Sequence, residues 1–335
     1  MAWTLEGVRR LLAPCALGTA LFIAGPAAAA GDREPLPVAG SFHRFWSRAE
    51  GRPFEAQLRL WDRLIEQPRQ GLYGTAVWET RDHPDWRARK IRLLRGRFAD
   101  YARIASRIPG AEQALTAGLP GQAARFRALF PDAAVHPAIR LVLAPNFDAK
   151  SGVLEDGTPI LLLAVDSLVL EHADTGILLP HELFHLYHAA HAGVLNDGVM
   201  PGATLLLPLF AEGLATQVSS VLAPGHTDGQ LLLQEDLSAL PPARLPEIAR
   251  RFLADADRPA VDPAHPEAFR RWFNASPAGS RDGLPDRTGY WLGLQVVRHL
   301  EKAHTLQEMA SWPPARAQTE ARGALRSLAG GLKDP

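Results

Sequence analysis

The pentapeptide His181-Glu182-Leu183-Phe184-His185 constrains the possible folds of this chain more than any other stretch of the sequence. Residues four apart share one face of an α-helix, which has about 3.6 residues per turn, so both imidazoles can reach a single metal ion. Leu183 and Phe184 make that helix apolar, and a buried helix that carries two histidines and a glutamate needs partners for them. The pentapeptide therefore predicts a helix that is packed inside the protein and holds a metal ion.

The pentapeptide is an H-E-x-x-H motif, which is typical of zinc hydrolases. Zinc lowers the pKa of a bound water towards about 7, and a glutamate beside the metal can take a proton from that water and pass it to a leaving amine. We expect one zinc ion per chain, with His181 and His185 as ligands and Glu182 as general base and then general acid. Pro180 fits the first turn of such a helix, but it kinks the helix if the helix begins near Asp174.

A catalytic zinc ion usually has three protein ligands, and Glu212 is our first candidate for the third. It is the lone carboxylate in the apolar stretch from Leu209 to Thr216, where a second helix is expected. Gly213 and Ala215 are small, so this helix can lie close to the H-E-x-x-H helix. Burying an unpaired carboxylate is costly, and a metal ion removes that cost. These features favour Glu212.

His191 is the alternative third ligand. It stands six residues after His185, the spacing of the longer motif H-E-x-x-H-x-x-G-x-x-H, and Met200 follows it as in a Met-turn. That motif needs glycine where this sequence has His188, and a left-handed conformation there costs about 1–2 kcal/mol. If the helix continues, His191 points away from His185, and His188 lies about 10.5 Å along the axis from His181, too far to share its metal. We expect His188 to support the ligands or to line the cleft.

The H-E-x-x-H motif, followed by Phe210-Ala211-Glu212-Gly213-Leu214-Ala215-Thr216, resembles the gluzincin peptidases, in particular a group of poorly characterised exported bacterial proteins predicted to be zinc-dependent peptidases. A later helix in that group carries Tyr-x-x-Gly, which Tyr290-Trp291-Leu292-Gly293 matches. The resemblance covers roughly residues 138–300. It implies a zincin-like fold, with an edge strand and a small central sheet next to the H-E-x-x-H helix, a glutamate helix, and a helical lobe across the cleft. Many gluzincins have an aspartate, bonded to a metal-bound histidine, where this sequence has Thr216. The support of that histidine must therefore be weaker here or come from another residue.

Tyr290 is a candidate catalytic residue in its own right. Attack on a peptide carbonyl builds negative charge on its oxygen, and a phenol O–H can donate a hydrogen bond to that charge. Arg287 could do the same, or it could hold a carboxylate of the substrate. The alternative is that Tyr290 belongs to the core, because it begins an apolar helix with Leu292 and Leu294.

The first thirty residues read as a secretory signal. Arg9 and Arg10 precede an apolar run from Leu11 to Ala30, which ends in four alanines before a polar segment. We expect cleavage after Ala30 and an exported protein, periplasmic or secreted, with no stable membrane span after cleavage. A permanent anchor is the alternative, because about twenty apolar residues can span a bilayer, but two prolines within the run favour cleavage.

Composition excludes several classes of site and partner. The single cysteine, Cys15, lies inside the signal, so thiolates cannot serve the mature chain as nucleophile or metal ligands. Lys and Arg number 36, as do Asp and Glu, and this zero net charge lacks the basic excess of most nucleic-acid-binding proteins. We expect a peptide or protein substrate and no nucleic acid, and we interpret the basic stretch at 87–97 as a solvated helix face.

The spacing of apolar residues predicts a mostly helical α+β fold. Residues 31–52 look like an extended lead-in, and helical spacing starts at Phe54 and again at Leu94. Alternation from Ile139 to Ala144 predicts a strand, the apolar run 159–165 predicts a second, and turn residues between them suggest a hairpin-like region. Helices are expected at 174–192, 204–222, 229–239, 244–254 and 288–303, with loops between them, notably at 255–287.

These patterns divide the chain into a signal peptide (1–30), a helical N-terminal region (31–137), a zincin core with the metal site (138–222) and a helical C-terminal lobe (223–335). The expected function is that of an exported zinc metallopeptidase. Two alternatives are a metzincin-like peptidase that uses His191 as third ligand and an exported zinc-binding protein without catalytic activity.

Overall fold

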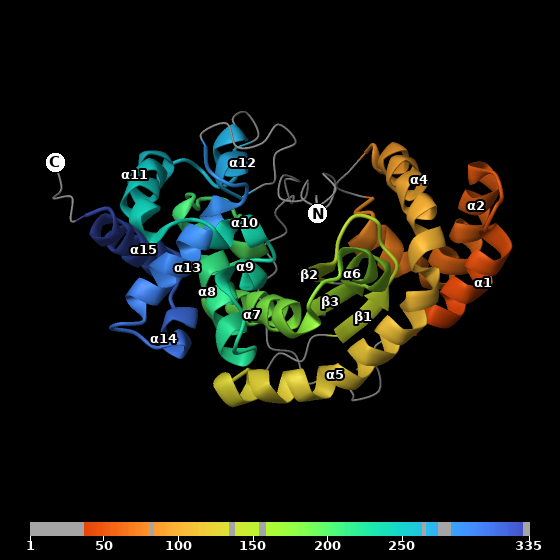
Figure 1. Ribbon diagram of the computed structural model, residues 1–335, viewed down its shortest axis with the longest axis horizontal. Helices are drawn as coiled ribbons and strands as arrows, with labels where there is room; N and C mark the ends of the chain where they lie inside the picture. The colour runs from red at the N-terminus through yellow and green to blue at the C-terminus, as the bar shows by residue number, and fades with distance from the viewer. Residues whose placement is uncertain are drawn as a thin grey trace. The chain divides into compact units, whose positions relative to one another are not determined.

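The computed structural model describes residues 37–80, 84–133, 138–153, 159–262, 266–273 and 283–330. Helices predominate and a small three-stranded sheet accompanies them, so the α+β class is confirmed (Figure 1). The described chain forms two compact units. The first comprises the described residues up to 123 together with 138–175, and the second comprises 124–133 and the described residues from 176 onwards. The division into four regions, which follows sequence patterns, stays a prediction.

The first unit holds the sheet and the N-terminal helices, and the stripes that begin at Phe54 and Leu94 lie in helices as expected. Its main elements are α1 (Ala39–Ala49), α2 (Phe54–Trp61), α4 (Trp86–Ile104), α5 (Ile108–Leu129, whose last turns belong to the second unit), β1 (Ala138–Val142), β2 (Ala149–Val153), β3 (Pro159–Ala164) and α6 (Val165–Glu171). Short helical turns connect α2 to α4, namely η2 (Asp62–Glu66), η3 (Gln67–Arg69), α3 (Gln70–Leu72) and η4 (Tyr73–Val77).

Helix α1 corrects one expectation, because it lies within residues 31–52, which look extended in the sequence. Aromatic side chains bury one face of α1. The backbone N–H groups of Val38 and Ala39 donate to the carboxylate of Glu112, in α5, at 2.5 and 2.8 Å. The N-terminal N–H groups of a helix need such acceptors, and here the acceptor is distant in the chain, so the local sequence shows no sign of it.

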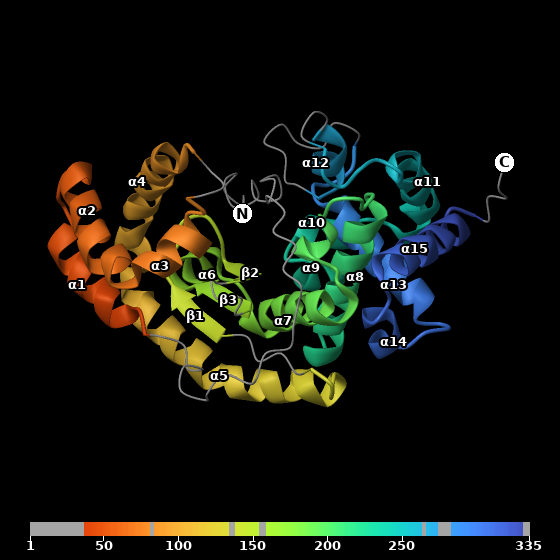
Figure 2. The ribbon, with the colours of Figure 1, turned by 180° about the vertical axis from the view of Figure 1, so that it is seen from behind.

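Strand β3 is the centre of the sheet, with β1 parallel to it on one side and β2 antiparallel on the other (Figure 2). Leu141 of β1 lies opposite Leu163, and Ser151 of β2 lies opposite Leu161. β1 and β3 match the two predicted strands, while β2 lies in the region predicted to be hairpin-like. The sheet belongs to the first unit and the H-E-x-x-H helix to the second, so their expected proximity stays a prediction.

A buried polar group ties α4 to the end of the sheet, and we call it the Arg97–Asp166 cluster. The carboxylate of Asp166 accepts hydrogen bonds from the N–H of Ala144 and the hydroxyl of Tyr101, both at 2.9 Å. The guanidinium of Arg97 lies 3.6 Å from the same carboxylate and donates to the Ser167 hydroxyl at 2.8 Å. Burial raises the pKa of Asp166, while Arg97 and the hydrogen bonds act in the opposite direction. Both charges of the cluster therefore have partners within the first unit.

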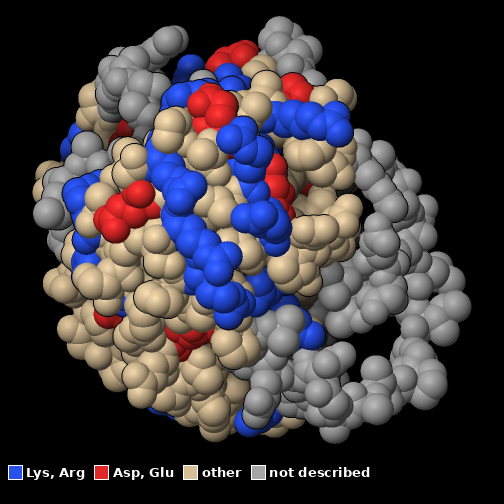
Figure 3. Space-filling model, turned by 90° about the vertical axis from the view of Figure 1, so that its right-hand side faces the viewer, with Lys and Arg blue, Asp and Glu red and all other residues tan. Residues whose placement is uncertain are grey.

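The basic stretch at 87–97 is only partly the solvated helix face that the sequence predicts. Its exposed basic side chains include Arg87, Arg92 and Arg95. Figure 3 shows Lys and Arg in bands over the side of the molecule where α1, α2 and α4 lie in Figure 1. Lys90, in contrast, is buried and pairs with Asp62 and Glu66 at 2.6 Å each, and Arg97 belongs to the buried cluster above. These two basic residues hold α4 against the rest of the first unit.

The second unit is helical. Its elements are the end of α5, α7 (Thr175–Ala192), η6 (Asn196–Gly198), α8 (Leu206–Leu222), α9 (Asp228–Leu231), α10 (Glu235–Ser238), η7 (Pro242–Arg244), α11 (Leu245–Asp255), α12 (Glu267–Phe273), α13 (Thr288–Leu300), α14 (Leu306–Ala310) and α15 (Pro314–Leu328). The helix predicted at 229–239 is two short helices, because Leu233 between them has a φ of 54°. The loop predicted at 255–287 contains α12, whose Trp272 donates to Asp255 at 3.0 Å.

Helices α8 and α13 pack backbone against backbone in the core of the second unit (Figures 1 and 2). A Cβ atom added to Gly213 of α8 would lie 2.2 Å from the carbonyl oxygen of Gly293 in α13. One added to Gly293 would lie 2.3 Å from the carbonyl oxygen of Leu209. No residue with a side chain fits at either position, so the two glycines set the distance between these helices.

Across the described ranges, we find no helix with the length and apolar character needed to cross a membrane. The predicted signal at 1–30, its cleavage site and Cys15 lie outside the described residues. Cleavage and export therefore stay predictions.

Candidate metal centre

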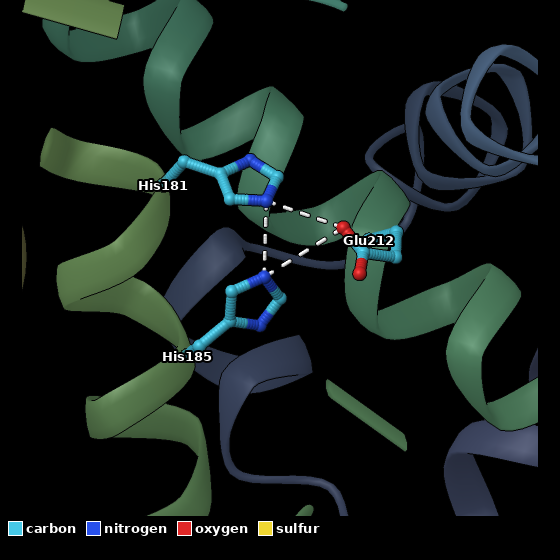
Figure 4. A group of neighbouring side chains, drawn as sticks. All are labelled: His181, His185 and Glu212. Carbon is cyan, nitrogen blue, oxygen red and sulfur yellow. Dashed lines mark hydrogen bonds and ion pairs between the residues drawn. The ribbon is translucent and has the colours of Figure 1, made fainter. Parts of the chain in front are cut away.

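Two helices of the second unit bring the three predicted zinc ligands together, and we call them the His–His–Glu cluster (Figure 4). Helix α7 presents His181 and His185, and α8 presents Glu212 opposite them. The Nε2 atoms of the histidines lie 3.0 Å apart, and Oε2 of Glu212 lies 3.2 Å from Nε2 of His181 and 3.6 Å from that of His185. Among the described residues, no other group of three His, Cys, Asp or Glu offers ligand atoms all within 4.8 Å of one another. The cluster is close enough to hold a metal ion.

Packing between the two helices supports this arrangement. Helix α7 begins at Thr175, so Pro180 lies inside the helix rather than in its first turn. Ser219 of α8 donates to the carbonyl oxygen of Ile177 in α7 at 2.9 Å, about one turn before His181. Most side chains around the ligands on both helices are buried, so the packing of α7 against α8 aligns the ligands.

The electrostatics of the cluster favour a bound cation. The side chains of His185 and Glu212 are 4% and 6% exposed, and that of His181 is 16% exposed. Burial disfavours the charged form of Glu212, but the charge of His185 and the hydrogen bond from His181 hold its pKa well below the usual range. Burial lowers the pKa of His181, whereas at His185 the charges of Asp197 and Glu212 outweigh burial and raise the pKa to about 10. An ionised carboxylate beside two imidazoles is a donor set that zinc commonly binds in proteins.

Asp197, in the short turn after α7, is a part of the site that the sequence does not reveal. Its Oδ1 lies 3.2 Å from Nδ1 of His185, the ring nitrogen that does not face Glu212. The contact is within ion-pair distance but lacks hydrogen-bond geometry, so it acts through charge, which favours a proton on Nδ1 and leaves the Nε2 lone pair for a metal. Position 216 does not supply this contact, because Thr216 donates to the carbonyl oxygen of Glu212 at 2.8 Å. In the sequence, Asp197 reads only as a turn residue between two helices.

Glu182 lies beside the His–His–Glu cluster without belonging to it. Its side chain is half-buried, and its negative charge contributes to the raised pKa of His185. Consecutive residues of a helix are about 100° apart around the axis, so Glu182 leaves the ligand face that His181 occupies. This position suits a group that handles protons next to a metal.

The two other histidines of α7 lie away from the cluster. His188 is fully buried, with its ring centre 5.1 Å from that of Phe184, and neither ring nitrogen has a hydrogen-bond partner within the described structure. Burial lowers its pKa to about 3, so it is neutral at pH 7. It is a core residue that, among the described residues, neither lines a cleft nor forms a hydrogen bond to a ligand, the two roles that we expected. His191 stacks on Tyr187, and its Nε2 lies 3.7 Å from the carboxylate of Asp132.

Tyr290 reaches the neighbourhood of the cluster through the close packing of α8 and α13. It lies one turn before Gly293, and Gly293 contacts Gly213, the residue that follows Glu212. Its side chain is 9% exposed, so it is largely buried as the core alternative requires. Burial and then the charge of Glu212 raise its pKa, while the guanidinium of Arg287, 4.2 Å from the ring centre, acts in the opposite direction. Tyr290 thus lies within electrostatic reach of a predicted ligand.

A scan against protein-family models and searches of curated proteins and of solved structures found no match to this chain. The functional argument therefore rests on the residues and geometry of the site.

Proposed function

We propose that this protein is an exported zinc-dependent peptidase of the gluzincin type, in which His181, His185 and Glu212 hold one zinc ion. The observation that carries the proposal is the convergence of two Nε2 atoms and a carboxylate oxygen beside the glutamate of an H-E-x-x-H motif. The buried carboxylate and the support that Asp197 gives to His185 add to it.

Zinc bound there would polarise a peptide carbonyl and lower the pKa of a water molecule towards about 7. His181 and His185 contribute neutral nitrogen donors, and Glu212 contributes one negative charge. Glu182 takes a proton from the attacking water onto its carboxylate and later passes that proton to the leaving amine. Glu182 can do so because it stands outside the set of three ligands.

Tyr290 completes the proposed machinery as a hydrogen-bond donor. Its raised pKa keeps the phenol protonated at neutral pH. The O–H can then donate to the negative charge that develops on the carbonyl oxygen of the substrate. We prefer Glu212 to His191 as third ligand, because the Nε2 of His191 faces Asp132 instead of the cluster.

The test compares wild-type protein with Glu182→Gln for zinc content and for cleavage of casein. We expect one zinc per chain in both proteins and a loss of cleavage of at least about 10²–10⁴-fold in the variant, the usual contribution of general acid–base catalysis. A chelator should abolish wild-type cleavage, and added zinc should restore it. Chelator-resistant cleavage or an active Glu182→Gln variant would refute the mechanism, and zinc binding without any cleavage would favour the non-catalytic alternative.

A further inference from the structure

Arg287, directly before α13, is a charged residue that the proposed reaction leaves without a role. Its side chain is half-buried, with the guanidinium carbon 4.2 Å from the ring centre of Tyr290. In the part of the chain that the structure describes, no carboxylate lies within ion-pair distance of it. Arg298, on the same helix, forms a bidentate pair with Asp228 at 2.7 and 2.8 Å. The charge of Arg287 is therefore not neutralised in the way that the charge of Arg298 is.

The backbone around Arg287 is held by contacts on both sides. Its φ of 60° and ψ of 22° lie in the left-handed region, which residues other than glycine seldom adopt. On one side, Gln234 donates to the carbonyl oxygen of Asp286 at 2.8 Å. On the other, a Cβ added to Gly289 would lie 2.7 Å from the carbonyl oxygen of Trp272, so the start of α13 is pressed against α12. Such strained positions persist where their surroundings enforce them, and they are frequent at functional sites.

The same helix start connects Arg287 to the metal centre. Tyr290 is one turn before Gly293, where α13 touches α8 next to Glu212. The negative charge of Glu212 and the positive charge of Arg287 act on the same phenol in opposite directions. The charges of Arg287 and Glu212 therefore both reach the Tyr290 side chain, whose ring lies beside the guanidinium.

We propose that Arg287 binds a carboxylate of the peptide substrate and so positions the peptide at the metal centre. A guanidinium offers parallel N–H donors that match both oxygens of a carboxylate, and such a pair is stronger in a half-buried place than in open solvent. The carboxylate can be the C-terminus of the peptide, which would make the enzyme a carboxypeptidase, or the side chain of an aspartate or glutamate. That the ligand is a peptide rests on the proposed function.

Binding measurements test this contact without relying on turnover. The zinc-loaded Glu182→Gln protein is titrated by calorimetry with three probes: an acetylated trialanine with a free carboxylate, its C-terminal amide, and an acetylated Ala-Glu-Ala amide. We expect at least one carboxylate probe to bind about ten-fold more tightly than the neutral amide, as a charged hydrogen-bonded pair allows. Preference for the free C-terminus indicates a carboxypeptidase, and preference for the glutamate probe indicates recognition of an acidic side chain.

Three further variants in the same background identify the residue responsible. Arg287→Gly accepts the left-handed backbone and removes the side chain with its guanidinium, so the preference of about ten-fold should vanish while zinc content is unchanged. Arg287→Lys keeps the charge but loses the two-pronged geometry, so it should retain only part of the preference. Arg250→Ala removes an exposed arginine of α11 and should leave the preference unchanged.

A carboxylate preference that survives in Arg287→Gly would overturn the proposal, and so would equal binding, or no binding, of all three probes by the Glu182→Gln protein. Failure of the proposed function has a different signature, namely absence of zinc or casein cleavage that Glu182→Gln does not reduce. The two ideas can therefore fail separately.

Discussion

The Arg97–Asp166 cluster of the first unit and the His–His–Glu cluster of the second both bury charge, but they differ in how that charge is balanced. The Arg97–Asp166 cluster contains its own cation. The guanidinium lies 3.6 Å from the carboxylate, and an N–H group and a hydroxyl donate to the same carboxylate at 2.9 Å. Every strong acceptor of that cluster meets a donor, which is the pattern of a structural network.

In the His–His–Glu cluster, three groups with lone pairs converge instead. Two imidazole nitrogens and a carboxylate oxygen lie 3.0–3.6 Å apart, and no lysine or arginine of the described residues pairs with Glu212. Protons on the histidines can balance such a site, but a metal ion satisfies all three donors at once. The comparison indicates that a buried carboxylate balanced only by imidazoles is a candidate metal site, because a metal ion can replace their protons, whereas a buried carboxylate balanced by a guanidinium holds the fold together.

The largest expected effect falls on the Arg97–Asp166 cluster. Asp166→Ala leaves the buried guanidinium of Arg97 without its carboxylate, so the free energy of unfolding should fall by about 3–5 kcal/mol. Urea denaturation measures the loss, with the exposed Glu50→Ala as a control that should stay within about 0.5 kcal/mol of wild type. The folded fraction should still bind zinc, and a loss below about 1 kcal/mol would remove the distinction between the clusters.

Removing a proposed ligand should weaken zinc binding but not the fold of the first unit. Glu212→Ala should lower zinc affinity by more than about 100-fold, because a direct ligand contributes more than the partners around it. Competition with a chelator measures the affinity. His191→Ala is the matched control and should bind zinc like wild type. Loss of zinc in His191→Ala, with retention in Glu212→Ala, would favour the metzincin-like alternative.

Asp197→Asn tests the support of His185 and should have a smaller effect. An amide at this place no longer stabilises the proton on Nδ1 by charge, so zinc affinity should fall by about 10–100-fold with the fold intact. The same chelator competition measures it, with Asp132→Asn as a control at the carboxylate that faces His191. An affinity equal to that of wild type would show that the 3.2 Å contact of Asp197 does not orient the ligand.

The smallest effect concerns His188, whose buried ring nitrogens have no partner in the described structure. His188→Leu removes two unsatisfied polar atoms, so zinc-free protein should gain about 1 kcal/mol of stability at pH 7.

The stability that His188→Leu gains over wild type should grow as the pH falls. The pKa of His188 is lowered from 6.5 to about 3 on folding, so between these values the unfolded chain binds a proton that the folded chain does not. Protonation then favours the unfolded state, and His188 costs wild-type stability as the pH falls from about 6.5 towards 3. Urea denaturation at pH 7 and pH 5 compares the two proteins. A difference that is the same at both pH values would contradict this account of His188.

Much of the fold and part of the site could be predicted from the sequence, because they depend on local spacing. The side-chain periodicity of a helix places His181 and His185 on one face of α7 without help from the rest of the chain. Alternation likewise predicts β1, and an apolar run predicts β3. Helix α1 shows the limit of prediction from local spacing, because Glu112, far away in the chain, accepts the hydrogen bonds of the first N–H groups.

The amino-acid sequence by itself determined that two histidines and the glutamate between them lie on one helix. It also identified a second apolar helix whose single carboxylate is a candidate ligand. Only the tertiary structure decided which residues meet, because that depends on packing between elements distant in the chain. The packing of α7 against α8 brings Glu212 to 3.2 Å from His181, and the turn after α7 aims Asp197 at His185. His188 lies on nearly the same face of α7 as His181 but about two turns further along the helix, where packing buries it among aromatic rings. Helical spacing places residues on one face of one element, whereas long-range contacts decide which part of that face becomes a site.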